Sequence, residues 1–260
     1  MLRRAIPLFE VLSMDNNNIL LSAADDLYNL CERRGCAVFS RFYDGGEQAL
    51  LQDSRMIYGN SLLFGGNAKC ERKILGVFPE WETPDTDSFP VTLIKCTCSF
   101  KKDFTHRDYL GSLMGLGIER DRIGDIVVTE DAGYFFLHNS ISDYVISNLK
   151  KIGSHGVKVS VQNINEMEYP EGKFAILKTV VASMRLDAVV GGATNLSRSK
   201  CAALIEHEKV SVNHRLTVEC SAKVAQGDLL SVRGFGRFLV CSVEGETRSG
   251  RLHISIKKYL

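Results

Sequence analysis

The sequence has few of the features that mark a membrane protein, a metalloprotein or a cofactor-dependent enzyme. No stretch approaches the ~18 uncharged apolar residues that a membrane span needs. Pro7 and Glu10 interrupt the apolar residues at the start of the chain, so this start is not expected to act as a signal peptide. We therefore expect a cytoplasmic protein that has no membrane partner.

Cysteine spacing argues against a metal site. The chain has eight cysteines but no Cys-x-x-Cys pair, which structural zinc sites usually contain. Cys96 and Cys98 are predicted to occupy alternate positions of a strand, and so to face the same side of a sheet. Buried reduced thiols are the expectation, and neither a metal nor any other cofactor is predicted.

The net charge of +1 over 260 residues hides an uneven distribution. Residues 184–260 contain 12 Lys and Arg against 7 Asp and Glu, a net charge of +5, whereas residues 1–183 carry −4. A basic segment attached to an acidic remainder suggests a polyanionic partner for the basic segment. If only the charge is considered, an ordinary solvated surface with no partner explains this distribution about as well as a polyanionic partner does.

Two stretches rich in turn-forming residues divide the chain. Residues 79–90 hold three of the five prolines and four acidic residues without a basic one, which predicts an exposed linker. Residues 163–172 include Pro170, Glu171 and Gly172 and predict a second boundary. The predicted class is α+β, with an N-terminal mixed α/β domain at 1–80, a central domain at 88–165 and a small basic α+β domain at 180–260.

The first domain has a helical spacing of apolar residues from about Asn18 to Arg34, and Gly35 is expected to end this helix. A second helix is predicted to begin after Asp44. A strand at 62–64 should then lead into a turn at Gly65 and Gly66. No residue of this domain carries recognisable chemistry.

The middle of the chain predicts a β-α-β-β-α-β order, with strands at 91–98, 126–128, 134–137 and 157–161. Thr105 and Asp108 fit a capping box at the start of the first helix. Ser140 to Asp143 should cap the second helix, which is expected to run to about Lys151. This is the split βαβ order of ferredoxin-like folds, which RNA-recognition modules share, so the domain at 88–165 is predicted to resemble RNA-recognition motifs (RRM-like).

Two groups in the RRM-like domain are candidates for contact with RNA. Tyr134 and Phe136 lie on a strand whose aromatic residues stack on bases in RNA-recognition modules. The flanking basic residue of the usual motif is missing, so packing in the core is the favoured interpretation. His106 and Arg107 stand at a predicted helix start and are secondary RNA-binding candidates, with a solvated first turn as the alternative.

The C-terminal domain predicts two short helices followed by a short-stranded sheet. Arg185 opens the first helix, and residues 195–197 form the turn and N-cap of the second. Arg198 and Lys200 lie about 200° apart around the axis of this second helix. They therefore flank the stripe of apolar side chains by which the helix must face the core. Unpaired N–H groups and the positive end of the helix dipole at the same place favour phosphate.

Basic residues also stand at or near the predicted turns of the sheet, whose strands are expected at 210–212, 215–218, 229–232, 238–243 and 252–256. Gly234 and Gly236 let the backbone approach a ligand, and the arginines on either side can each donate two hydrogen bonds to one phosphate. Solvated loop arginines are the alternative. The RNA-binding candidates of this domain are Arg185, Ser197, Arg198, Ser199, Lys200, Lys209, Asn213, Arg215, Arg233 and Arg237.

These motifs carry a resemblance to known families. Leu196-Ser197-Arg198-Ser199-Lys200, Lys209-Val210-Ser211-Val212-Asn213 and Gly227-Asp228 resemble the small RNA-binding domain named after the fourth small-subunit ribosomal protein (S4-type). With His106-Arg107-Asp108-Tyr109-Leu110-Gly111 and Ile123-Gly124-Asp125-Ile126, most of the chain resembles the bacterial YlmH family. His214 stands where many S4-type domains have glycine, which predicts a looser turn.

The resemblance implies a cytoplasmic, ribosome-associated RNA-binding protein. Its expected partners are rRNA, tRNA and the large ribosomal subunit. Members of the family are implicated in the rescue of obstructed large subunits and have been linked to cell division. We expect phosphate and shape recognition of structured RNA, with little reading of bases. The sequence leaves the oligomeric state open, and a monomer is the expectation.

Two other function classes fit parts of the sequence. One is an RNA-modifying enzyme of the pseudouridine synthase or methyltransferase type, because Arg185-Leu186-Asp187 resembles a pseudouridine synthase motif that contains the catalytic aspartate. Asp187 here opens the small domain itself, and no Gly-x-Gly-x-x-Gly cofactor loop is present, so no catalytic residue and no small-molecule substrate are predicted. The other class is a protein-interaction adaptor in cell division, which would use the acidic part of the chain.

Overall fold

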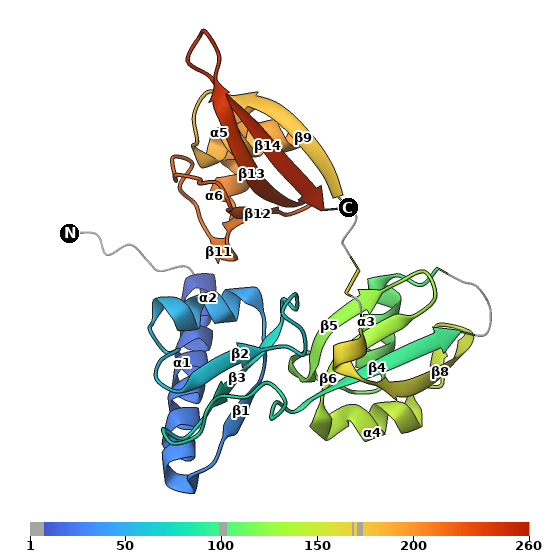
Figure 1. Ribbon diagram of the computed structural model, residues 1–260. Coiled ribbons are helices and arrows are strands. Elements are labelled where there is room, and N and C mark those ends of the chain that lie inside the picture. The colour runs from blue at the N-terminus through green and yellow to red at the C-terminus, as the bar shows by residue number, and fades with distance from the viewer. Residues whose placement is uncertain (1–7, 99–102, 168, 171–173, 260) are drawn as a thin grey trace. The chain divides into compact units, whose positions relative to one another are not determined.

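Three β-sheets organise the part of the chain that the structure describes, which is residues 8–98, 103–167, 169–170 and 174–259 without the side chains of 8–15. The coordinates are a computed structural model (Figure 1). The chain forms two compact units, Met1–Pro170 and Glu171–Leu260. The first unit contains two of the sheets and therefore combines the segments predicted as the first two domains, whereas the second unit contains the third sheet.

The N-terminal sheet has the strand order β1-β3-β2, with β1 at Val38–Tyr43, β2 at Ser61–Phe64 and β3 at Lys73–Val77. Helix α1 spans Leu8–Arg34 and so begins earlier than the apolar spacing predicted. Helix α2, Gly45–Asp53, begins after Asp44 as predicted. The Asp44 carboxylate accepts from the N–H of Glu47, and the Glu47 carboxylate accepts from the N–H of Asp44, which forms a capping box.

The second sheet has the order β5-β6-β4-β8-β7, and its elements follow the predicted β-α-β-β-α-β sequence. The described elements are β4 (Val91–Cys98), α3 (His106–Gly115), η1 (Arg120–Arg122), β5 (Ile123–Val128), β6 (Gly133–His138), α4 (Asn139–Asn148), β7 (Lys151–Ile152), β8 (His155–Gln162) and η2 (Ile164–Glu166). Thr105 and Asp108 form the predicted capping box of α3.

The predicted cap of α4 was wrong. His138, the last residue of β6, is the N-cap, and its Nδ1 accepts from the N–H of Ser140. The helix therefore begins directly at the end of the strand. It ends at Asn148 because Lys151 and Ile152 form β7, which pairs with β8.

Helices α3 and α4 cover one face of the second sheet. The core on this face includes Leu113 of α3, Val145 of α4 and Phe135 of β6, each with no exposed surface. Cys96 is buried in this core and Cys98 packs against it, which confirms that both face the same side of the sheet.

The opposite face of the second sheet packs against the N-terminal sheet. The core on this face joins Phe42 and Ile74 of the first sheet to Leu93 and Phe136 of the second. Phe89, near the end of the predicted linker, is also buried in it. Because the two sheets share this core, residues 1–80 and 88–165 do not form separate compact units.

A polar network crosses the same contact. The Asp125 carboxylate accepts hydrogen bonds from the N–H groups of Glu71 and Arg72 at 2.8 and 2.9 Å, and from the hydroxyl of Tyr169 at 2.9 Å. Burial and the charge of Asp125 raise the pKa of Tyr169. The Arg72 Nε donates to the carbonyl of Ile123 at 3.0 Å. These bonds fix β5 against the segment that leads into β3.

The second unit has one sheet with the order β11-β10-β12-β13-β14-β9 and two helices. Its elements are β9 (Phe174–Val181), α5 (Leu186–Thr194), α6 (Arg198–Glu206), β10 (Val210–Val212), β11 (Arg215–Leu216), β12 (Leu229–Val232), β13 (Gly236–Glu246) and β14 (Leu252–Tyr259). The sequence did not predict β9, which pairs along the whole of β14. Helices α5 and α6 share one core with the sheet.

The β10–β11 turn is tight, contrary to the expectation from His214. Val212 pairs with Arg215, so only Asn213 and His214 form the loop, and both have positive φ, at 49° and 67°. Two such residues are typical of a type I′ hairpin turn, in which glycine is common but not obligatory.

All eight cysteines lie in described residues and are free thiols. Burial raises the pKa of Cys70 and of Cys96 to about 12. Among the helices that the structure describes, none is long and apolar enough to span a membrane.

The contact between the two sheets of the first unit can be tested at Gly66. A Cβ there would overlap the ring of Phe136, and the backbone φ is +102°. We expect Gly66→Ala to lower the free energy of unfolding by about 3 kcal/mol, through strain and overpacking. Gly59→Ala is the matched control, since Gly59 has a φ of +58° and no neighbour within 4 Å. Gly59→Ala should lower the free energy of unfolding, measured in urea, by only about 1 kcal/mol. Equal losses in the two variants would argue against the packed contact at Gly66.

Candidate nucleic-acid interface

The start of α6 carries the predicted pair of cations. Ser197 is the N-cap residue, and its side chain makes no capping hydrogen bond; its hydroxyl lies 3.2 Å from that of Ser199. Arg198 and Lys200 are exposed in the first turn. The N–H groups of this turn have no partner within the helix, so they remain available to an anion next to the two cations.

Arg198 and Lys200 have different surroundings. Arg198 lies close enough to Asp187 for its charge to lower the pKa of that carboxyl group, although the larger cause is the hydrogen bonding of Asp187 with Arg185. Lys200 lines a hollow on another part of the helix surface. The two side chains therefore flank the start of the helix from different sides.

Arg185 is held by Asp187. Its Nε and Nη2 donate to the two carboxylate oxygens, both at 3.1 Å, and the N–H of Ala188 donates to the same carboxylate at 2.9 Å. Lys223 pairs with Arg185 in an isolated β-bridge. Two N–H groups of the Arg185 guanidinium already donate to Asp187. Arg185 therefore has fewer hydrogen-bond donors left for a phosphate than Arg198 has.

Lys200 and Lys209 border an apolar hollow of about 350 Å³. The N–H of Arg233 donates to the carbonyl of Lys209 at 2.8 Å, which places the β12–β13 turn beside these lysines. The sequence predicted the three cations but not the hollow, because its lining comes from two separate segments, 196–209 and Phe235. The full lining is Leu196, Lys200, Ala203, Leu204, His207, Lys209 and Phe235.

The remaining predicted residues of this unit lie elsewhere. Arg215 is exposed on β11, separated from Lys209 by the length of β10, which is about 10 Å. Arg237 pairs with Ser231, whereas the neighbouring Val232 is buried against the helices. Since side chains alternate along a strand, Arg237 points to the other face of the sheet.

Asn213 has a structural environment. Its Nδ2 donates to the Asp228 carboxylate at 2.8 Å, and its Oδ1 accepts from the N–H of Leu229 at 2.9 Å. These two bonds tie the β10–β11 turn to the start of β12. The sequence placed Asn213 among the RNA-binding candidates, but its carboxamide is engaged within the chain.

The two aromatic candidates of the first unit differ in how much of the ring is exposed to solvent. Phe136 is fully buried, and its ring stacks on Tyr169 with centroids 6.5 Å apart. Tyr134 is half-buried, and the Lys95 ammonium lies 5.8 Å from its ring centroid. The core packing preferred from the sequence is therefore found for Phe136.

His106 and Arg107 are the first two residues of α3 and are exposed. Partial burial and the charge of Arg120 lower the pKa of His106. His106 is consequently a weak source of positive charge at neutral pH, and Arg107 is the stronger phosphate ligand of the two.

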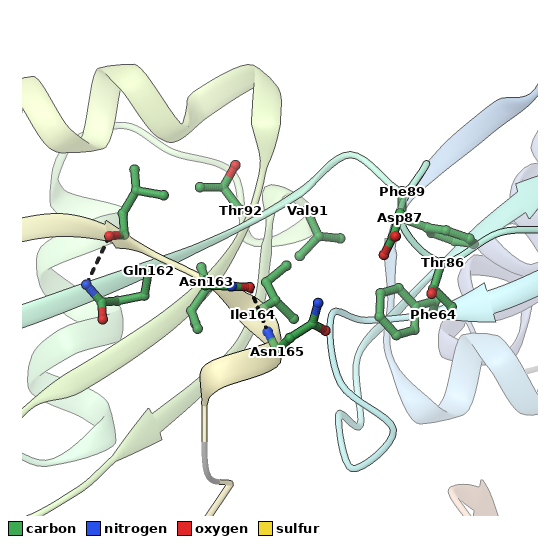
Figure 2. A pocket seen from close by; sticks show the side chains of 12 residues that line it. Phe64, Thr86, Asp87, Phe89, Val91, Thr92, Gln162, Asn163, Ile164 and Asn165 are labelled. Carbon is green, nitrogen blue, oxygen red and sulfur yellow. Dashed lines mark hydrogen bonds between the residues drawn. The ribbon is translucent and has the colours of Figure 1, made fainter.

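A hollow of about 440 Å³ lies between the two sheets of the first unit (Figure 2). Phe64, Thr86, Asp87 and Phe89 stand on one side, and Thr92 with the segment 162–165 on the other. The amides of this segment can both donate and accept hydrogen bonds. The lining contains no Lys or Arg, and it includes the Asp87 carboxylate, so it suits a neutral polar group better than a phosphate.

Comparisons with known proteins find a matching family model, a similar protein and a similar solved structure. Residues 84–168 match a family model described as "Putative RNA-binding domain in YlmH". The chain is 32% identical over 219 residues to "Ribosome-associated protein quality control protein P2" of Bacillus subtilis (strain 168), and the alignment covers 84% of this chain and 85% of that protein. A solved structure, "Cell division protein ylmH from Streptococcus pneumoniae", has 19% identity and a TM-score of 0.47, covering 64% of this chain and 98% of the other.

The environment of Asn213 leads to a testable stability effect. Asn213→Ala removes both side-chain hydrogen bonds and places alanine at a φ of 49°. We expect a loss of about 2–3 kcal/mol in the free energy of unfolding, measured in urea. Asn213→Gly should lose less, because only the hydrogen bonds are removed. Unchanged stability of the alanine variant would contradict this structural role.

Proposed function

The chain belongs to the YlmH family, and on that premise we propose that it is a ribosome-associated RNA-binding protein that acts in ribosome quality control. Three findings support the proposal. The B. subtilis relative carries that role in its name and is similar over 85% of its length. The segment 84–168 matches a family model described by RNA binding. The second unit exposes cations around a helix start.

The observation that carries the proposal is the exposed start of α6. Arg198 and Lys200 flank N–H groups that no side chain caps. A phosphate at this point would receive hydrogen bonds, the favourable end of the helix dipole and two positive charges together. Glu206 and Glu208 lie at the other end of the helix and would repel a backbone that continued along it. The helix start is therefore the proposed contact.

We further propose that the second unit is an S4-type domain that binds structured rRNA of the large subunit with tRNA nearby. Contacts to phosphates and to the shape of the RNA would dominate, because the helix start offers cations and N–H groups, which bind phosphate without reading a base. Any effect on cell division would follow from this role at the ribosome. The protein would then work where ribosomes are, in the cytoplasm.

We propose that this role is not enzymatic. Asp187 is the residue that resembles a catalytic aspartate of pseudouridine synthases. Both of its carboxylate oxygens are hydrogen-bonded by Arg185, and the side chain is 11% exposed. A nucleophile needs a free lone pair that faces a substrate. The geometry therefore supports a structural role for Asp187 at the start of α5.

The proposed contact predicts a change in salt dependence. Arg198→Ala and Lys200→Ala should each weaken RNA binding, and the slope of log K against log salt should fall by about one unit per lost phosphate contact. Titrations of purified large subunits at several salt concentrations would measure this. Arg248→Ala is the matched control, because it removes one exposed positive charge of the same unit in the β13–β14 hairpin.

Sucrose-gradient sedimentation followed by crosslinking tests the ribosomal role itself. We expect the wild-type chain to co-sediment with large subunits at low salt and to crosslink to rRNA. Recovery of the wild type only in ribosome-free fractions would overturn the ribosomal assignment. If the double variant of Arg198 and Lys200 sediments as the wild type does, the assigned contact is wrong even though the association is real.

A further inference from the structure

The sheet of the second unit has a second face that α5 and α6 do not cover. Leu230, Phe238 and Ile256 are buried toward the helices. Strand β9 alternates accordingly: Leu177 packs against that core, whereas Phe174 and Ile176, which precede it at alternate positions of the strand, are 41% and 50% exposed. Figure 1 shows β13, β14 and β9 side by side.

Strand register arranges this face in rows. Tyr259 of β14 pairs with Phe174 of β9, and the register of β13 with β14 places Arg237 opposite Tyr259. In the next row, Lys257 pairs with Leu239 on one side and with Ile176 on the other. Directly opposite residues on neighbouring strands point to the same face, about 5 Å apart. Aromatic and basic side chains therefore lie next to one another.

Cation–ring contacts confirm the shared face. The Lys257 ammonium lies 3.7 Å from the ring centroid of Phe174 and 5.7 Å from that of Tyr259. The Arg237 guanidinium lies 5.8 Å from the ring centroid of Tyr259. We call the residues Phe174, Ile176, Lys178, Arg237, Leu239, Lys257 and Tyr259 the outer face.

The charges of the outer face have one sign. Its three charged members are Lys178, Arg237 and Lys257, and the positions that pair with them include Ser231 and Ser255. Glu244 and Glu246 of β13 lie toward the β13–β14 hairpin, at the opposite end of the strand from Arg237. A polyanion is therefore the complementary partner.

We propose that the outer face binds unpaired RNA, with bases stacked on Phe174 and Tyr259 and phosphates held by Arg237, Lys257 and Lys178. Open sheet faces that alternate aromatic rings with cations bind single strands in this way, because every base has a face that can stack and every nucleotide carries a phosphate. The inference goes beyond the contact at the start of α6, since it concerns another face and another form of RNA, but it rests on the proposed RNA-binding function.

The ring of Phe174 becomes available when Lys257 moves. A base that stacks on Phe174 displaces the ammonium from the ring, and the flexible lysine side chain then reaches the phosphate of the same nucleotide. Stacking of a base on an aromatic ring exceeds an exposed cation–π contact in strength, so the exchange is favourable. An acidic protein segment would gain from the cations but has no comparable use for the two rings.

The test compares two RNA probes on the full chain: a fluorescein-labelled oligouridylate of about ten nucleotides and a fully paired RNA hairpin. Phe174→Leu and Tyr259→Leu should each weaken oligouridylate binding about tenfold, measured by fluorescence anisotropy, and leave hairpin binding unchanged. Phe174→Tyr and Tyr259→Phe retain a ring and should bind as the wild type does. Trp81→Ala, which removes an aromatic side chain that is 78% exposed in the first unit, is the matched control.

The design separates this inference from the proposed function. Arg198→Ala with Lys200→Ala should reduce hairpin binding more than oligouridylate binding. Photocrosslinking with oligouridylate containing 4-thiouridine should modify the peptides that contain Phe174 or Tyr259. Oligouridylate binding that is equal in the leucine variants and the wild type would overturn the outer-face site, whatever the hairpin result.

Two further outcomes are decisive. If the leucine variants lower co-sedimentation with ribosomes but keep full oligouridylate affinity, the outer face binds a protein, and the RNA assignment is overturned. Should a leucine variant unfold, as circular dichroism would reveal, the ring-retaining variants with Lys257→Ala still test the site. Lys257→Ala should then reduce the salt slope for oligouridylate by about one unit.

Discussion

The structure depends on the packing of two sheets in the first unit around Phe136. This ring has no exposed surface, and it lies among apolar residues from both sheets. It also packs against Gly66, where a larger residue would overlap the ring. Asp125 adds three hydrogen bonds across the same contact, two from backbone N–H groups and one from Tyr169. Burial of apolar surface on both faces around Phe136 makes this part of the second sheet an interior layer, which removes its central aromatic residue from solvent.

This constraint changes where nucleic acid can bind. In RNA-recognition modules the sheet face that carries the aromatic residues is open, but in this chain the N-terminal sheet covers that face around Phe136. Both proposed RNA contacts accordingly lie in the second unit. The second unit offers a helix start with two cations on one side of its sheet and, on the other side, a face with two aromatic rings that α5 and α6 do not cover.

Local features were predictable to the extent that they rest on neighbouring residues. The capping box at Thr105 lies where the sequence placed it, and α2 begins after Asp44 as predicted, because each helix start is decided within four residues. The cap of α4 was missed because His138 belongs to a strand whose end depends on the pairing of β4 with β6. Strand β9 was missed because its sequence shows no regular alternation of apolar and polar residues: Phe174, Ile176 and Lys178 share one face but differ in polarity. Only the pairing with β14 defines the two faces of the strand.

The order of elements, the basic character of residues 184–260 and the cations at the start of α6 follow from short-range patterns and composition, which need no knowledge of distant residues. Tertiary packing decided which of those residues are free to act. It buried Phe136, occupied the side chains of Arg185 and Asn213, and sent Arg233 and Arg237, only four residues apart, toward different parts of the sheet. The physical reason is that exposure and hydrogen-bond partners depend on contacts between segments far apart in the chain, which a local pattern does not encode.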